Sequence, residues 1–174
     1  MSEAARLEQS IASAQFGEHD LQQWMASLQG VYQDLFTSQR ITVHCDQDLG
    51  LLRVVPELLQ QALDKLITNA SDFSTPSSDI NIALVKLDKG FRLTVENEGS
   101  SLHKDVLDTL FEPMISQRQH ERKNSSTDEM DAPHLGLGLY IVRLVAECHR
   151  GWPFAENTIN GVRIGFIFFS EPAE

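Results

Sequence analysis

The sequence has few of the residues that mark several common classes of protein. Its 174 residues include two cysteines, Cys45 and Cys148, which lie far apart and form no Cys-x-x-Cys motif. A disulfide framework and a structural zinc site are therefore not expected. No apolar run approaches the roughly 20 residues that cross a membrane. No signal peptide is visible, so we expect a cytoplasmic domain without direct membrane contact.

Basic residues are also scarce. The chain has 14 Lys and Arg against 25 Asp and Glu, which gives a formal net charge of −11. Such a chain has no basic surplus to neutralise a phosphate backbone, which argues against a general nucleic-acid-binding function. A small anion could still bind locally through backbone N–H groups and a few arginines. The length and an apolar content of 41% indicate one domain with a real core.

Hydrophobic periodicity predicts a mixture of helices and strands. Asp20 is a candidate N-cap, Pro56 fits the first turn of a helix, and Gly151 is a candidate helix stop. The order predicts a two-layer α/β (α+β) sandwich, whose mixed, mostly antiparallel sheet is covered on one face by helices. Helices are predicted over residues 2–16, 20–38, 56–73, 104–111 and 138–149, and strands over 40–45, 51–55, 79–87, 91–97, 152–157 and 161–169.

The first helix carries a short heptad pattern. Ala4, Leu7, Ile11 and Ala14 have the a/d spacing, but two heptads are too few to hold a coiled coil alone. The pattern fits either a helix docked on the domain or the end of a longer dimer helix.

Residues 112–134 are almost wholly polar, and the sequence LGLGL follows at residues 135–139. A loop of this length inside a compact domain is usually functional or disordered. The glycines lack the third member of a dinucleotide fingerprint and are followed by no Gly-Lys-Ser/Thr. They open a helix, whose free N–H groups suit a phosphate. The segment is therefore either a phosphate site or a plain loop-to-helix turn.

Two further polar features lie upstream. On the helix over 56–73, a polar stripe that includes Lys65, Asn69 and Asp72 lies opposite the leucine face. The stripe is either a solvated face or, at Asn69, a neutral oxygen suited to Mg²⁺ shared with phosphates. Residues 95–102, VENEGSSL, form a strand that ends at Asn97 and turns at Gly99.

In this order and spacing, these segments resemble the ATP-binding catalytic domain of bacterial sensor histidine kinases, in the superfamily shared with gyrase, Hsp90 and MutL. Asn69-Ala70 resembles the N box, residues 95–102 the G1 box, Phe111 the F box, and residues 135–142 (LGLGLYIV) the G2 box. The resemblance covers about residues 40–170. It implies that residues 1–18 end a dimerisation and phosphoacceptor helix, and that residues 19–174 form the catalytic domain with an ATP lid at about 112–134.

The resemblance also implies residue roles. ATP and Mg²⁺ would be the ligands, Asn69 and Lys65 the catalytic residues, and Asn69 the metal ligand. Asn97 would read the adenine, and backbone N–H groups of residues 135–139 would cradle the phosphates. The full nucleotide-binding set is Asn69, Asp72, Phe73, Asn97, Gly99, Leu102, Arg118, His134, Leu135, Gly136, Leu137, Gly138 and Leu139.

Four positions depart from the family pattern. Lys65 replaces a polar N-box residue, Asn97 an adenine-reading Asp, Ser101 the second G1 glycine, and His134 the first G2 glycine. These changes leave open a degenerate module that signals without phosphoryl transfer. An ATP-hydrolysing clamp is disfavoured, because the acidic candidates for its base are only Asp64 and Asp72.

No histidine has the context of a phosphoacceptor, so the chain is expected to be a protein-histidine kinase fragment that cannot phosphorylate itself. Its expected partners are ATP, its own dimerisation and phosphoacceptor domain in a homodimer, and a response regulator. The whole protein is expected to be anchored in the inner membrane.

Overall fold

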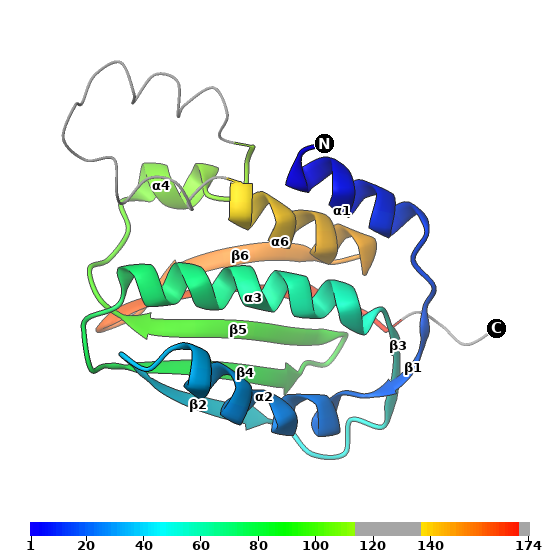
Figure 1. The fold of residues 1–174 in the computed structure, drawn as a ribbon, viewed down its shortest axis with the longest axis horizontal. Coiled ribbons are helices and arrows are strands. Elements are labelled where there is room, and N and C mark those ends of the chain that lie inside the picture. The colour runs from blue at the N-terminus through cyan, green and yellow to red at the C-terminus, as the bar shows by residue number, and fades with distance from the viewer. Residues whose placement is uncertain (114–136, 171–174) are drawn as a thin grey trace.

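The computed structural model describes residues 1–113 and 137–170. Within them a five-stranded sheet has the order β2-β4-β5-β7-β6, with helices over one face (Figure 1). Only β2 and β4 run parallel in this sheet. The expected mixed, mostly antiparallel sandwich is confirmed. The strands are β2 Arg40–Cys45, β4 Asp79–Lys86, β5 Phe91–Glu98, β6 Trp152–Asn157 and β7 Gly161–Phe168.

In the part of the chain that the structure describes, three helices cover the sheet. α2 (Leu21–Leu35) lies over β2, α3 (Pro56–Phe73) over β5, and α6 (Leu137–Cys148) over β6 and β7. They pack there because alternate strand residues are apolar and buried, as Ile80, Ile82 and Leu84 are in β4. Each such side chain stabilises the fold by about 1.5–3 kcal/mol when fully buried. A short α4 (Lys104–Thr109) follows β5. In the described ranges, no helix is long and apolar enough to cross a bilayer.

The predicted helix starts are confirmed, and the predicted stop of α6 needs a correction. Asp20 caps α2 by accepting a hydrogen bond from the Gln23 N–H at 3.2 Å. At the end of α6, Arg150 takes the left-handed conformation (φ 62°), and the Gly151 N–H donates to Ala146 O. Gly151 is required for a different reason, because a Cβ there would lie 1.7 Å from Ile167 O.

The N-terminal residues form two elements that pack on the domain. β1 (Gly17–Asp20) pairs antiparallel with β3 (Leu51–Val54), a small sheet that the polar sequence of β1 did not predict. α1 (Glu3–Ala12) packs against α6 (Figure 1). The helix predicted over 2–16 ends at Ala12, so Ala14 of the heptad pattern lies outside it. Leu7 is 2% exposed, so the apolar side of α1 is used within this chain. That residues 1–18 end a dimerisation helix stays a prediction.

His149 ties the end of α6 to the start of α3. The histidine is fully buried, its Nε2 accepts a hydrogen bond from the Val55 N–H at 3.1 Å, and its Nδ1 lies 3.0 Å from Val145 O. These partners require the neutral ring with the proton on Nδ1. Burial lowers the pKa of His149 below its ordinary value of 6.5.

The protein is therefore expected to lose stability as the pH falls below about 6.5. Between the lowered pKa of folded His149 and the ordinary value, the unfolded chain binds more protons than the folded chain. The free energy of unfolding should then rise with pH by at most about 1.4 kcal/mol per unit for this one group. Urea unfolding of wild type and His149→Gln between pH 5.5 and 7.5 measures the slope. Equal slopes in the two proteins would remove His149 as its source.

Candidate functional site

Asn69 is the most informative side chain of the site. It lies in the C-terminal half of α3, is 5% exposed, and its amide nitrogen has no hydrogen-bond partner among the described residues. The polar stripe is therefore not a solvated face at this position. Leaving a buried amide group unpaired costs about 1–3 kcal/mol. Such a group calls for a specific explanation, and a ligand is the simplest one.

The end of β5 lies against the end of α3. Asn97 is 6% exposed on the helix-covered side of β5, and its amide nitrogen donates to Glu98 O at a long 3.3 Å. A Cβ at Gly99 would lie 2.6 Å from Phe73 O. Glycine is thus needed for the two backbones to approach. The predicted residues Phe73, Asn97 and Gly99 are brought together here.

The start of α6 lies beside Lys65. A Cβ at Gly138 would lie 3.7 Å from Lys65 Cδ, so the first turn of α6, whose N–H groups have no partner within the helix, is next to this lysine. Leu137 is the first residue of α6, and Leu139, two residues further on, is fully buried. The predicted positions Arg118, His134, Leu135 and Gly136 lie outside the described residues.

Two residues of the predicted nucleotide-binding set, Asp72 and Leu102, have no described contact with Asn69, Asn97 or Lys65. Asp72 is exposed on α3. Leu102 is half-buried in the loop after β5. The side chain of Asn157, at the end of β6, hydrogen-bonds both the backbone N–H and the backbone carbonyl of Leu102. The Asn157 amide accepts from the Leu102 N–H at 2.8 Å and donates to Leu102 O at 2.9 Å. The sequence did not point to Asn157, because a single asparagine at a strand end has no distinctive pattern.

A second residue that the sequence did not point to is Glu3 of α1. Its Oε1 lies 2.5 Å from Lys65 Nζ, and both side chains are partly exposed. Lys65 thus extends from α3 past the start of α6 to α1. Its ammonium is paired there with the Glu3 carboxylate.

Asp64, the other acidic candidate beside Lys65, belongs to a junction between α2 and α3. Its Oδ1 accepts hydrogen bonds from the Tyr32 hydroxyl at 2.6 Å and from Gln60 Nε2 at 3.0 Å. Burial, together with the Asp64 carboxylate, raises the pKa of Tyr32 above its ordinary range. Asp64 therefore has a structural role, because it joins α3 to α2.

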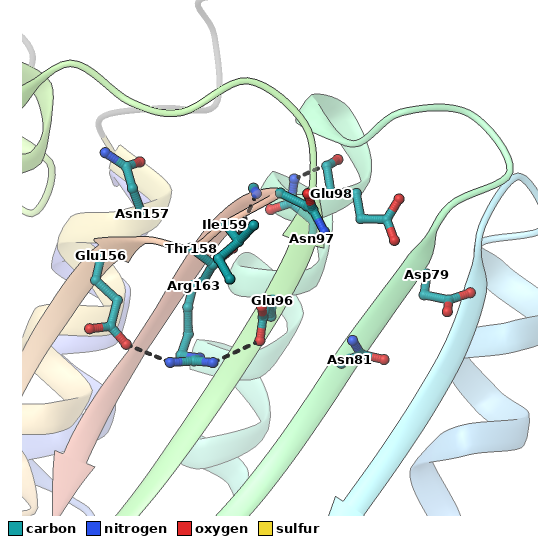
Figure 2. Close-up of a pocket in the computed structure, with 12 residues that line it drawn as sticks. Asp79, Asn81, Glu96, Asn97, Glu98, Glu156, Asn157, Thr158, Ile159 and Arg163 are labelled. Atoms are coloured by element: carbon teal, nitrogen blue, oxygen red, sulfur yellow. Dashed lines mark hydrogen bonds and ion pairs between the residues drawn. The ribbon is translucent and has the colours of Figure 1, made fainter.

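A separate groove of about 740 Å³ lies on the open face of the sheet, away from the helices (Figure 2). Arg163 bridges Glu96 and Glu156 there, with N–O distances of 3.0 and 2.7 Å. Asp79 and Glu98 add two more carboxylates. This excess of negative charge disfavours a polyphosphate in the groove, although Asn97 borders it.

The residues present fit an ATP-bound Mg²⁺ better than a metal held by protein alone. The described residues contain no cluster of three His, Cys, Asp or Glu side chains that could hold a metal. Mg²⁺ is commonly bound by one or two side chains together with waters and substrate phosphates. Asn69, which is buried and lies one helical turn from Lys65 on α3, has a side-chain oxygen of the kind required.

Comparison with known proteins gives a family match. The family described as "Histidine kinase-, DNA gyrase B-, and HSP90-like ATPase" matches residues 54–171. The chain is 29% identical over 140 residues to the sensor protein KdpD of Clostridium acetobutylicum, which covers 80% of this chain and 14% of KdpD. It is 28% identical over 111 residues to the sensor histidine kinase CpxA of Escherichia coli (strain K12), which covers 63% of this chain and 22% of CpxA. The chain thus spans less than a quarter of either relative.

Solved structures share the fold. The catalytic domain of histidine kinase ThkA superposes with a TM-score of 0.73 at 20% identity, covering 91% of this chain and 99% of that one. ThkA in complex with the response regulator protein TrrA superposes with a TM-score of 0.70 at 19% identity, covering 98% of this chain and 49% of that one. At these identities the likeness concerns the fold alone.

Proposed function

The chain belongs to the family of histidine kinase-, DNA gyrase B- and HSP90-like ATPases, and we propose how it uses ATP. It is the ATP-binding domain of a sensor histidine kinase, as the sequence resemblance indicated. In the proposed reaction, the γ-phosphate of ATP is transferred to a histidine of a dimerisation domain outside this chain. A response regulator would then receive the phosphoryl group. The ThkA–TrrA complex supports such a partner.

Asn69 carries this proposal, because it is buried and its amide nitrogen has no hydrogen-bond partner among the described residues. Its side-chain oxygen would hold Mg²⁺, which supplies neutralisation of the phosphate charge when bound. The start of α6 would offer backbone N–H groups to the phosphates. Asn97 would accept a hydrogen bond from the adenine amino group, and Gly99 would let the backbone approach the base. Phosphoryl transfer requires mainly this positioning and charge neutralisation.

The family pattern assigns no role to a lysine at position 65, because a different polar residue usually stands there. The Lys65 ammonium cannot ligate Mg²⁺ or act as a base, and the lysine lies next to the helix terminus where phosphates would bind. We therefore assign it to phosphate binding. As the family resemblance implies, we further propose that the domain lies on the cytoplasmic side of an inner-membrane protein.

A transfer assay in trans tests the proposal. The chain is mixed with a separately produced phosphoacceptor domain of a sensor histidine kinase and with Mg²⁺ and γ-labelled ATP. That kinase's own catalytic domain serves as the positive control. We expect acid-labile label on the acceptor histidine. Tight nucleotide binding without label, where the positive control transfers, would favour a module that signals without phosphoryl transfer.

A further inference from the structure

The ion pair between α1 and α3 lies at the edge of the proposed phosphate site. Lys65 and Asn69 are one helical turn apart on α3, so both side chains are on the same side of the helix. The Lys65 stem passes Gly138 at the start of α6 before its ammonium reaches Glu3 at 2.5 Å. One lysine thus connects the N-terminal helix with the part of α6 that would bind phosphate.

The position of Glu3 depends on the docking of α1. Leu7 of α1 is 2% exposed in the core, and α1 packs against α6. Ser2 caps α1 by accepting a hydrogen bond from the Ala5 N–H, which fixes the helical turn that carries Glu3. The first turn of α1 therefore presents a carboxylate to the site only while the helix is docked.

We propose that docking of α1 and binding of nucleotide oppose each other through Lys65, so that the N-terminal helix regulates the site. The inference rests on the function proposed above. A polyphosphate carries more negative charge than Glu3 and would compete for the same ammonium. The Glu3 carboxylate would also repel the phosphates directly. Both effects weaken nucleotide binding while α1 is docked. Thermodynamic linkage makes the coupling reciprocal, so bound nucleotide lowers the docking equilibrium constant of α1 by the same factor by which docked α1 lowers nucleotide affinity.

The size of the coupling is bounded by the exposure of the pair. The Lys65 and Glu3 side chains are 34% and 48% exposed, so water and salt screen their attraction. Removing an exposed ion pair of this kind changes an equilibrium constant roughly two- to fivefold at low ionic strength. The effect should shrink as salt is added.

The variant Glu3→Gln tests the coupling, with Glu8→Gln as its control. Glu8 is exposed on the same helix, so both variants remove one negative charge from α1. In calorimetric titration with an ATP analogue and Mg²⁺, Glu3→Gln is expected to bind about two- to fivefold more tightly than Glu8→Gln at low salt. Hydrogen exchange of the α1 amides is the second measurement. Nucleotide should speed this exchange in wild type and Glu8→Gln, and much less in Glu3→Gln.

The outcomes separate this inference from the function on which it rests. Equal affinity of the two variants, with α1 exchange unaffected by nucleotide, would overturn the coupling and leave the ATP site standing. Weaker binding by Glu3→Gln would also overturn it, because Glu3 would then present Lys65 to the phosphates. No binding by wild type would overturn the proposed function itself.

Discussion

Replacing Asn69 with alanine is expected to weaken Mg²⁺-dependent nucleotide binding at least about tenfold while changing the stability of the free protein by less than about 1 kcal/mol. Binding would lose the only amide oxygen that we assign to the metal. Stability would hardly change, because the substitution removes packing contacts and, with them, a buried amide nitrogen that has no described partner. The loss of packing and the relief of an unpaired polar group have opposite signs.

The two measurements together distinguish a ligand-binding residue from a structural one. Titration calorimetry gives the affinity, and urea unfolding without nucleotide gives the stability. Asn81→Ala is the matched control, because Asn81 is exposed on the open face of the sheet. It should bind nucleotide as wild type does. A large stability loss in Asn69→Ala with unchanged affinity would show that Asn69 serves the fold.

The second large effect is expected for Gly161→Ala. A Cβ at this position would lie 1.8 Å from Asn97 O and 2.8 Å from Asn97 C. The obstacle is backbone, so β7 and the end of β5 would have to separate in a pair joined by ladder hydrogen bonds. We expect a loss of about 2–3 kcal/mol in the free energy of unfolding. Nucleotide affinity should also fall, because Asn97 would be displaced.

Gly30→Ala is the control for this substitution. Gly30 lies in α2, and a Cβ there would meet no atom within 4 Å. Alanine is favoured over glycine inside a helix, so this variant should be more stable by about 0.5–1 kcal/mol. Thermal and urea unfolding of both variants give the comparison. A Gly161→Ala protein as stable as wild type would contradict the close contact of the two strands.

The elements with strong local patterns could be predicted from the sequence. α3 combines a regular leucine face with a proline at its first position, and the strands of the hairpin β4–β5 alternate in polarity. The predicted boundaries of these elements therefore agree closely with those in the structure. β1 could not be predicted in this way. Its four residues are held by backbone pairing with β3, which leaves no signature in side chains. α6 ends one residue before the predicted position, because Arg150 adopts the left-handed conformation in which glycine is the usual residue.

The candidate site shows the same division. Asn69 could be singled out because an amide interrupts the pattern of its helix, whereas Asn97 and Gly99 were indicated only by the resemblance to the family. The burial of the two asparagines and the close backbone contact at Gly99 were then found in the structure. The contact of Glu3 with Lys65 could not be predicted, because it joins residues 62 positions apart through the docking of α1. Sequence periodicity described the apolar side of α1 and left open what it covers.

The central claim is that this chain binds ATP through a Mg²⁺ ion shared between Asn69 and the phosphates. Calorimetric titration of the wild-type chain with a non-hydrolysable ATP analogue, with Mg²⁺ and then with excess chelator, tests it most directly. We predict one site per chain whose affinity falls at least about tenfold when Mg²⁺ is removed. Undetectable binding, or an affinity that is the same with and without Mg²⁺, would contradict the claim.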